Sequence, residues 1–198
     1  MYVFFLSLSL LASAMSTNAE KPPYEEDPDH FGEQYILHIT GGRGMDKIMV
    51  TINEKLYTRT RNYQTTSNYR CQSAEMIKKV SDTLYKYRLR ARKGMNPDDP
   101  YVEYEMLAKL YKSGKHQDYN AANFTMPSTG VHTTMKLMTK NVKETCFVFV
   151  VEQGDNNKEC EILVTKSTAG EEIPAECEKV YKQECPEPYV ALYDRTCT

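Results

Sequence analysis

The alternation of apolar and polar positions is clearest in residues 84–93, where it repeats every second residue. One set of alternate positions is aromatic or apolar: Tyr85, Tyr87, Leu89 and Ala91. The intervening positions are basic: Lys86, Arg88, Arg90 and Arg92. Successive side chains of a β-strand point to opposite faces of the sheet, so this segment is predicted to be an antiparallel strand. Its aromatic face is expected to be buried and its basic face to lie in solvent.

Seven further segments have the alternation or composition of strands, and turn-forming residues separate them. The eight predicted strands cover residues 55–62, 69–77, 84–93, 101–112, 117–126, 131–139, 145–153 and 158–166. Eight short strands joined in sequence predict a β-sandwich or an up-and-down barrel. An eight-stranded barrel has room for one small ligand. The same pattern also fits a filled core without a cavity.

Two segments outside the strands have helical spacing. In residues 173–184, four residues fall on one helical face: Ile173, Cys177, Val180 and Tyr181. Pro174 suits the first turn of this helix, and Pro186 and Pro188 end it. Residues 45–53 fit a short N-terminal helix as well as a strand.

The first nineteen residues carry no charged side chain and contain one apolar run, residues 2–11. This run is shorter than the roughly 20 apolar residues of a membrane-spanning helix. Small residues follow it, which predicts a secretory signal peptide over residues 1–19, cleaved after Ala14 or Ala19. A membrane anchor is the alternative. Residues 20–44 are predicted to form an extended leader, because the first part is rich in Pro, Glu and Asp and a glycine-rich breaker ends it.

Composition narrows the function classes. The net charge of −2 argues against a general nucleic-acid binder, which would show a basic excess. The chain has no Trp but fifteen Tyr, whose rings suit a half-wet pocket or surface. No second apolar run follows the signal peptide, so the mature protein is expected to be soluble. We also expect it to be secreted and monomeric, without a membrane or nucleic-acid partner and without a cofactor.

All six cysteines lie in the predicted mature chain: Cys71, Cys146, Cys160, Cys177, Cys185 and Cys197. An even number of cysteines behind a signal peptide predicts three disulfides. The closely spaced ligand pairs of a zinc site are absent from the sequence, and full pairing leaves no cysteine for catalysis. The count alone allows fifteen pairings. Asn123-Phe124-Thr125 is an acceptor sequence for an N-linked glycan at Asn123.

Four short segments near the C-terminus have a distinctive order: Cys146-Phe147-Val148, Cys160-Glu161-Ile162-Leu163-Val164, Ile173-Pro174-Ala175-Glu176-Cys177 and the final Cys197. Together with the signal peptide, the eight strands, the late helix and Cys71, they resemble the tick salivary lipocalins, the histamine-binding-protein family. The resemblance covers most of the mature chain in layout. It implies an all-β, eight-stranded antiparallel lipocalin-type barrel with a C-terminal helix over residues 45–198.

The resemblance also implies how the cysteines pair. It links Cys71 to Cys197 and Cys146 to Cys177, and it leaves Cys160 with Cys185, a pair that some family members share.

The function that the resemblance implies is capture of a small host mediator. Family ligands include histamine, serotonin, leukotrienes, thromboxane and cholesterol, and some members bind complement proteins. The family's Glu-Leu-Trp motif corresponds to Glu161-Ile162-Leu163, so the carboxylate is kept and the Trp is lost. Phe147 replaces an acidic residue, and Thr65, Thr66 and Ser67 stand where amine binders have an acid and a Trp.

A protonated amine requires a carboxylate for its charge and an aromatic face for a cation–π contact. The candidate ligand-binding residues are Glu161, Tyr57, Tyr63, Tyr85, Tyr87 and Phe147. Tyr63 falls where the family places a pocket tyrosine. Both faces of the strand that carries Glu161 are apolar, so alternation does not decide whether Glu161 points inward.

Two other ligand classes compete with an amine. A fatty acid or eicosanoid would need a cation for its carboxylate, which could come from Arg59, Arg61, Arg88, Arg90 or His132. The protein could instead act on a host protein through its outer surface. Glu103 and Glu105 alternate with apolar residues and are expected to face solvent. The four His lie in separate segments without a catalytic motif, which argues against an enzyme.

Overall fold

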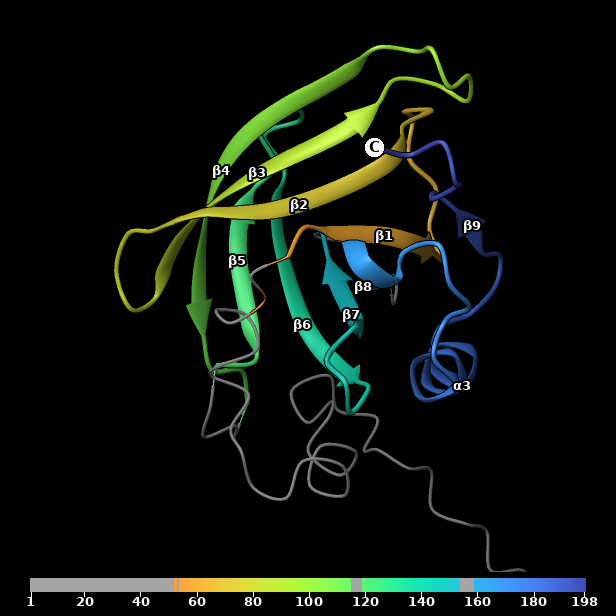
Figure 1. The fold of residues 1–198 in the computed structure, drawn as a ribbon. Helices are drawn as coiled ribbons and strands as arrows, with labels where there is room; N and C mark the ends of the chain where they lie inside the picture. Colours follow the sequence, from red (N-terminus) through yellow and green to blue (C-terminus); the bar gives the residue numbers. More distant parts are fainter. Residues whose placement is uncertain (1–51, 53, 115–118, 154–158) are drawn as a thin grey trace, which may run out of the picture.

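The computed structural model describes residue 52 and residues 54–114, 119–153 and 159–198. All eight predicted strands are present in it (Figure 1). They are β1 (Leu56–Arg61), β2 (Arg70–Lys79), β3 (Leu84–Arg92), β4 (Tyr101–Tyr111), β5 (Ala121–Thr125), β6 (His132–Lys140), β7 (Cys146–Glu152) and β8 (Glu159–Thr165). β5 begins four residues later than predicted, at Ala121. The predicted signal peptide, the leader and nearly all of the N-terminal segment 45–53 lie outside the described residues.

The strands form one closed antiparallel barrel. Each strand pairs with its neighbour in sequence, including β1 with β2. β1 also pairs with β8, which closes the barrel. A two-residue strand, β9 (Val190–Ala191), pairs with Thr60 and Arg61 at the C-terminal end of β1. It was not predicted from the sequence, because two residues carry no alternation signal.

The predicted C-terminal helix is α3 (Ala175–Glu184), which follows a short 3₁₀ turn, η3 (Lys166–Thr168). Pro174 precedes the first helical residue, where its fixed φ and missing N–H cost nothing. α3 lies against the outside of the barrel over β6, β7 and β8 (Figure 1). The structure joins Cys146 to Cys177 and Cys160 to Cys185, so two bridges hold this helix to β7 and β8.

The protein therefore has apolar cores on both sides of the β7–β8 wall. Residues that point into the barrel form one core, which includes Leu137, Phe147, Phe149 and Leu163. Residues that point outward form the other with α3: Tyr57, Val148, Val150, Ile162, Val164, Val180 and Tyr181 are among them. This double burial explains why β7 reads as a continuous apolar run, with its first six residues buried.

Two joints of the barrel wall have little direct strand pairing. β1 and β2 share only the pairs Leu56–Ala74 and Tyr57–Ser73. β4 and β5 share only Lys109–Asn123, Leu110–Ala122 and Tyr111–Ala121, although β4 pairs with β3 along most of its length.

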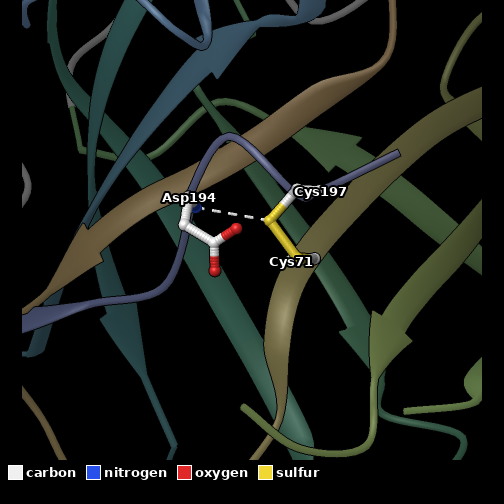
Figure 2. Close-up of side chains that lie close together, drawn as sticks. All are labelled: Cys71, Asp194 and Cys197. Carbon is white, nitrogen blue, oxygen red and sulfur yellow. Dashed lines mark hydrogen bonds between the residues drawn. A yellow bond between two sulfur atoms is a disulfide. The ribbon is translucent and has the colours of Figure 1, made fainter. Parts of the chain in front are cut away.

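The C-terminal tail closes the joint between β1 and β2. Leu192 donates its N–H to the carbonyl oxygen of Arg59 in β1, at 3.0 Å, and accepts from the N–H of Cys71 in β2, at 2.8 Å. The disulfide Cys71–Cys197 then ties the end of the tail to β2 (Figure 2). The tail is thus inserted between the two strands.

Arg92 corrects the prediction that all four basic residues of β3 face solvent. Its side chain is 0 % exposed. The guanidinium donates to Asp194 and Thr196 of the tail and to two backbone carbonyls in the β3–β4 turn. The tail covers this end of β3, and the sequence alternation of β3 carries no sign of a partner about 100 residues away.

Candidate ligand-binding site

The inward faces of the strands enclose an apolar cavity. It contains unfilled space that is partly open to solvent. Every strand of the barrel contributes to its lining: Ile52, Glu54, Leu56, Ala74, Met76, Tyr87, Met106, Ala108, Ala122, Phe124, Met135, Phe149 and Leu163. The side chains of the described residues therefore do not fill the barrel completely, which favours a cavity over the filled core that the sequence left open.

Glu161 points into the barrel. It lies two residues before the cavity-lining Leu163 on β8 and is the cross-strand partner of Phe149, which also lines the cavity. Its outward-facing neighbours Cys160 and Ile162 belong to the core under α3, which is why both faces of the strand are apolar. Part of the Glu161 side chain remains accessible. Glu161, Tyr63 and Arg61 lie beside the cavity-lining residues but do not themselves line the cavity.

Tyr63 and Arg61 accompany Glu161. The Tyr63 hydroxyl donates a hydrogen bond to a carboxylate oxygen of Glu161. Arg61 is the cross-strand partner of Glu161, and its guanidinium carbon lies 4.9 Å from the centre of the Tyr63 ring. Arg61 also donates to the Thr65 hydroxyl at 2.9 Å. The structure thus brings one anion, one cation and a phenol together at one side of the barrel interior.

The protonation equilibria of this cluster are shifted. Burial raises the pKa of Glu161, while the hydrogen bond from Tyr63 and the charge of Arg61 partly oppose the shift. Burial and the neighbouring Glu161 carboxylate raise the pKa of Tyr63 well above its ordinary value, so this phenol stays protonated. Burial also raises the pKa of Tyr87 to about 12. Burial disfavours the ionised form of a carboxyl group, and a cation bound next to it would stabilise that form.

Tyr57 does not belong to the barrel interior, although alternation along β1 groups it with Tyr63. It is 2 % exposed on the outer side, where its ring packs edge-on against Tyr193 of the tail. The register of β1 with β8 shifts between Thr58 and Thr60. One extra residue in a strand exchanges the faces of all residues beyond it, so Tyr57 points outward and Arg61 inward.

The other predicted pocket residues lie inside the barrel with different roles. Tyr87 lines the cavity. Tyr85 is buried beside it, in a cluster with Leu110 and Ala122, and does not border the cavity. Phe147 is fully buried in the interior core and also fills space without bordering the cavity.

Of the cations proposed to hold a lipid carboxylate, Arg61 is the one that the structure places inside. Arg59 lies outside, over the ring of Tyr193, and Arg88 and His132 are exposed. Arg90 lies on the outer face and pairs with Glu103, and Lys86 pairs with Glu105. The prediction that Glu103 and Glu105 face solvent is confirmed, since both are exposed.

Two further features lie on the outer surface. Cys71, Asp194 and Cys197 place potential metal ligands close together, but both sulfur atoms are used in the disulfide (Figure 2). Asn123 is half-buried on the outward face of β5, and its side-chain oxygen accepts a hydrogen bond from Thr134 at 2.7 Å. Its glycosylation stays a prediction.

The apolar lining of the cavity, apart from Tyr87, was not predicted from the sequence. Met76, Met106 and Met135 come from three different strands, and each occupies an ordinary alternate position. Inward positions that line an empty space and those that fill the core have the same periodicity, so alternation could identify the inward face but not the cavity.

Comparisons with known proteins identify a matching family and similar solved structures. A family model described as tick histamine binding protein matches residues 45–198. Among solved structures, japanin from Rhipicephalus appendiculatus, bound to cholesterol, has a TM-score of 0.55 at 12% identity and covers 78% of this chain and 100% of its own. A serotonin complex of AM182 has a TM-score of 0.55 at 12% identity and covers 74% of this chain and 86% of its own. At such identities these two structures support the fold alone. The comparison with curated proteins finds no match.

Proposed function

The chain belongs to the tick histamine-binding protein family, and from this premise we propose that it is a secreted salivary lipocalin that sequesters a small host mediator. Binding inside the barrel would lower the free concentration of a molecule on which host haemostasis, inflammation or immunity depends. The three disulfides are consistent with secretion. Within the described residues, no helix is long and apolar enough to cross a membrane.

The first candidate ligand is a biogenic amine, histamine or serotonin. The observation that carries this proposal is the inward-facing Glu161, whose pKa burial raises and whose neighbours are Tyr63 and the cavity-lining Phe149. An ammonium group could displace water from the carboxylate, while the ring of the amine contacts apolar and aromatic side chains. Neighbours that bind serotonin and cholesterol show that barrels of this fold accept small ligands.

The second candidate is an amphipathic lipid with a carboxylate or hydroxyl head group. Arg61 is 3 % exposed, and its Nε–H is buried without a hydrogen-bond partner among the described residues. A buried donor of this kind is costly to leave unsatisfied, and a ligand oxygen would satisfy it. The lining of the cavity is almost entirely apolar, which suits a hydrocarbon body.

Titration calorimetry of the purified protein distinguishes these candidates. Histamine, serotonin, a leukotriene and arachidonate are each titrated into wild-type protein and into Glu161→Gln and Arg61→Gln variants. An amine ligand is expected to lose affinity in the first variant, and a lipid carboxylate in the second. Absence of heat with all four molecules, together with capture of a serum protein by the immobilised chain, would refute sequestration and favour action through the outer surface.

We infer that the protein binds without turnover. Neither candidate needs a reactive group, and the polar residues of the interior form a cation–phenol–carboxylate set that fits recognition of a head group. Incubation of a bound ligand with the protein, followed by mass spectrometry of the released molecule, should return it unchanged.

A further inference from the structure

The two weakly paired joints of the barrel differ in how they are closed. The tail fills the joint between β1 and β2 with backbone hydrogen bonds to both strands, and Cys71–Cys197 makes this closure covalent. Between β4 and β5, pairing ends at Lys109–Asn123. In the part of the chain that the structure describes, no other element joins these two strands beyond that pair.

The unpaired part of this joint borders the cavity directly. Continuing the register of β4 and β5 would place Ala108 opposite Phe124 and Leu107 opposite Thr125. Ala108 and Phe124 both line the cavity. Leu107 is 51 % exposed and Thr125 is exposed, so both point outward. We name this gap in pairing, between Leu107–Ala108 and Phe124–Thr125, the fork.

The chemistry of the fork suits passage of an apolar molecule. Elsewhere along the wall, backbone hydrogen bonds between strands would have to break for a ligand to pass. At the fork no ladder bonds need to break, because the described pairing has already ended. Ala108 is small, and the inward side chains that flank it, Met106 and Phe124, offer apolar contact to a ligand on its way. Methionine in particular adapts to differently shaped partners.

We propose that ligands enter and leave the barrel sideways, through the fork between β4 and β5. This proposal rests on the proposed function, because an entry route matters only if the cavity binds a ligand. It implies that bridging the fork through the outward-facing Leu107 and Thr125 slows exchange with the cavity and leaves the lining of the cavity unchanged.

The absence of Trp from the chain allows a test that needs no ligand. A Phe149→Trp substitution places a single indole at the cavity, and its fluorescence is quenched by acrylamide as far as that small molecule can reach it. The substitution is made in two backgrounds: Leu107→Cys with Thr125→Cys, to bridge the fork, and Leu107→Ser with Thr125→Ser as the matched control. Both proteins are produced without an N-linked glycan, because changes at Thr125 affect the acceptor sequence.

We expect the quenching rate constant to be severalfold lower in the bridged protein than in the Ser control, with equal values once both are unfolded. Equal quenching of the two folded proteins would overturn the proposal, because the quencher would then reach the cavity through the barrel end. An indole that is already shielded in the Ser control would overturn it too.

Mass spectrometry shows whether the bridge has formed, which requires Cβ atoms roughly 3.5–4.5 Å apart. If it has not, Ala108→Phe replaces it and fills the fork from within, with the same indole and unchanged Ala108 as the control. The same two outcomes then decide. The quenching measurement uses acrylamide and no ligand. Its result therefore does not depend on whether the ligand titrations detect binding. The entry route through the fork and the proposed function are tested separately.

Discussion

Replacement of Glu161 by Gln should change ligand affinity and protein stability in opposite directions. Gln keeps the size of the side chain and an oxygen that can accept the hydrogen bond from Tyr63, but it removes the charge. If an amine is the ligand, its ammonium group loses its carboxylate partner. Removing one partner of a buried, hydrogen-bonded charge pair costs about 2–5 kcal/mol. The dissociation constant should therefore rise by about 30-fold to several thousandfold.

The stability change follows from the raised pKa of Glu161. A carboxyl group whose pKa is higher in the folded protein binds its proton more tightly there, so it stabilises the fold below its ordinary pKa of 4.5 in the unfolded chain. This contribution is lost as the pH rises through the folded pKa. Gln carries no charge at any pH. The variant without ligand should therefore melt at a higher temperature than the wild type at pH 8 and approach it at pH 4.

Calorimetry and thermal melts over this pH range measure both effects. Because an amine binds to the ionised carboxylate, its binding should also release protons, which titration in buffers of different ionisation enthalpy detects. Glu105→Gln is the matched control, since Glu105 pairs with Lys86 on the outer face. Unchanged amine affinity in Glu161→Gln would remove Glu161 from the site. A less stable Glu161→Gln protein at pH 8 would refute the argument from burial.

Three further outcomes are expected. Loss of the Cys71–Cys197 bridge, which closes a 126-residue separation, should cost about 5 kcal/mol in urea unfolding, against about 3.5 kcal/mol for the shortest loop; equal costs would contradict the loop-length argument. Asp194→Asn should lower the melting temperature at pH 7, and this loss should shrink as the pH falls below 3.8, because the Thr196 hydrogen bond and Arg92 lower the pKa of Asp194 and the stabilisation is lost as the pH falls through that pKa; a loss that is the same at every pH would contradict it. Protein secreted from a eukaryotic host should carry a glycosidase-sensitive mass at Asn123 that Thr125→Ala removes, and an unmodified wild-type chain would show that the site is unused.

The strands and the helix could be predicted because their signals are local. Alternation in β3, the turn residues between strands and the helical spacing before Pro186 each lie within a dozen residues. Their bounds in the structure differ from the prediction by a few residues at most. The barrel, by contrast, was separated from a sandwich only by the family resemblance, because closure depends on the pairing of β1 with both β8 and β2.

Local signals failed where a distant segment or a bulge decides the environment. The register shift at Thr58–Thr60 depends on how β1 meets β8, so the opposite faces of Tyr57 and Tyr63 could not be read from their even spacing. The burial of Arg92 depends on Asp194 and the tail. Glu161 was identified as a candidate, but its inward direction became clear only once α3 was seen to cover the other face of β8.

The spacing of the three disulfides along the chain has a consequence for the order in which the protein matures. The two bridges of α3 join cysteines 31 and 25 residues apart, and all four of these cysteines lie within residues 146–185. Closing a short loop sacrifices less chain entropy than closing a long one. We therefore expect the β7–β8 hairpin and its helix to oxidise first. Cys71 and Cys197 come together only after the strands between them have paired. We therefore expect the newly made chain to pass through a two-disulfide intermediate in which the barrel is formed but the C-terminal tail is not yet bonded to β2.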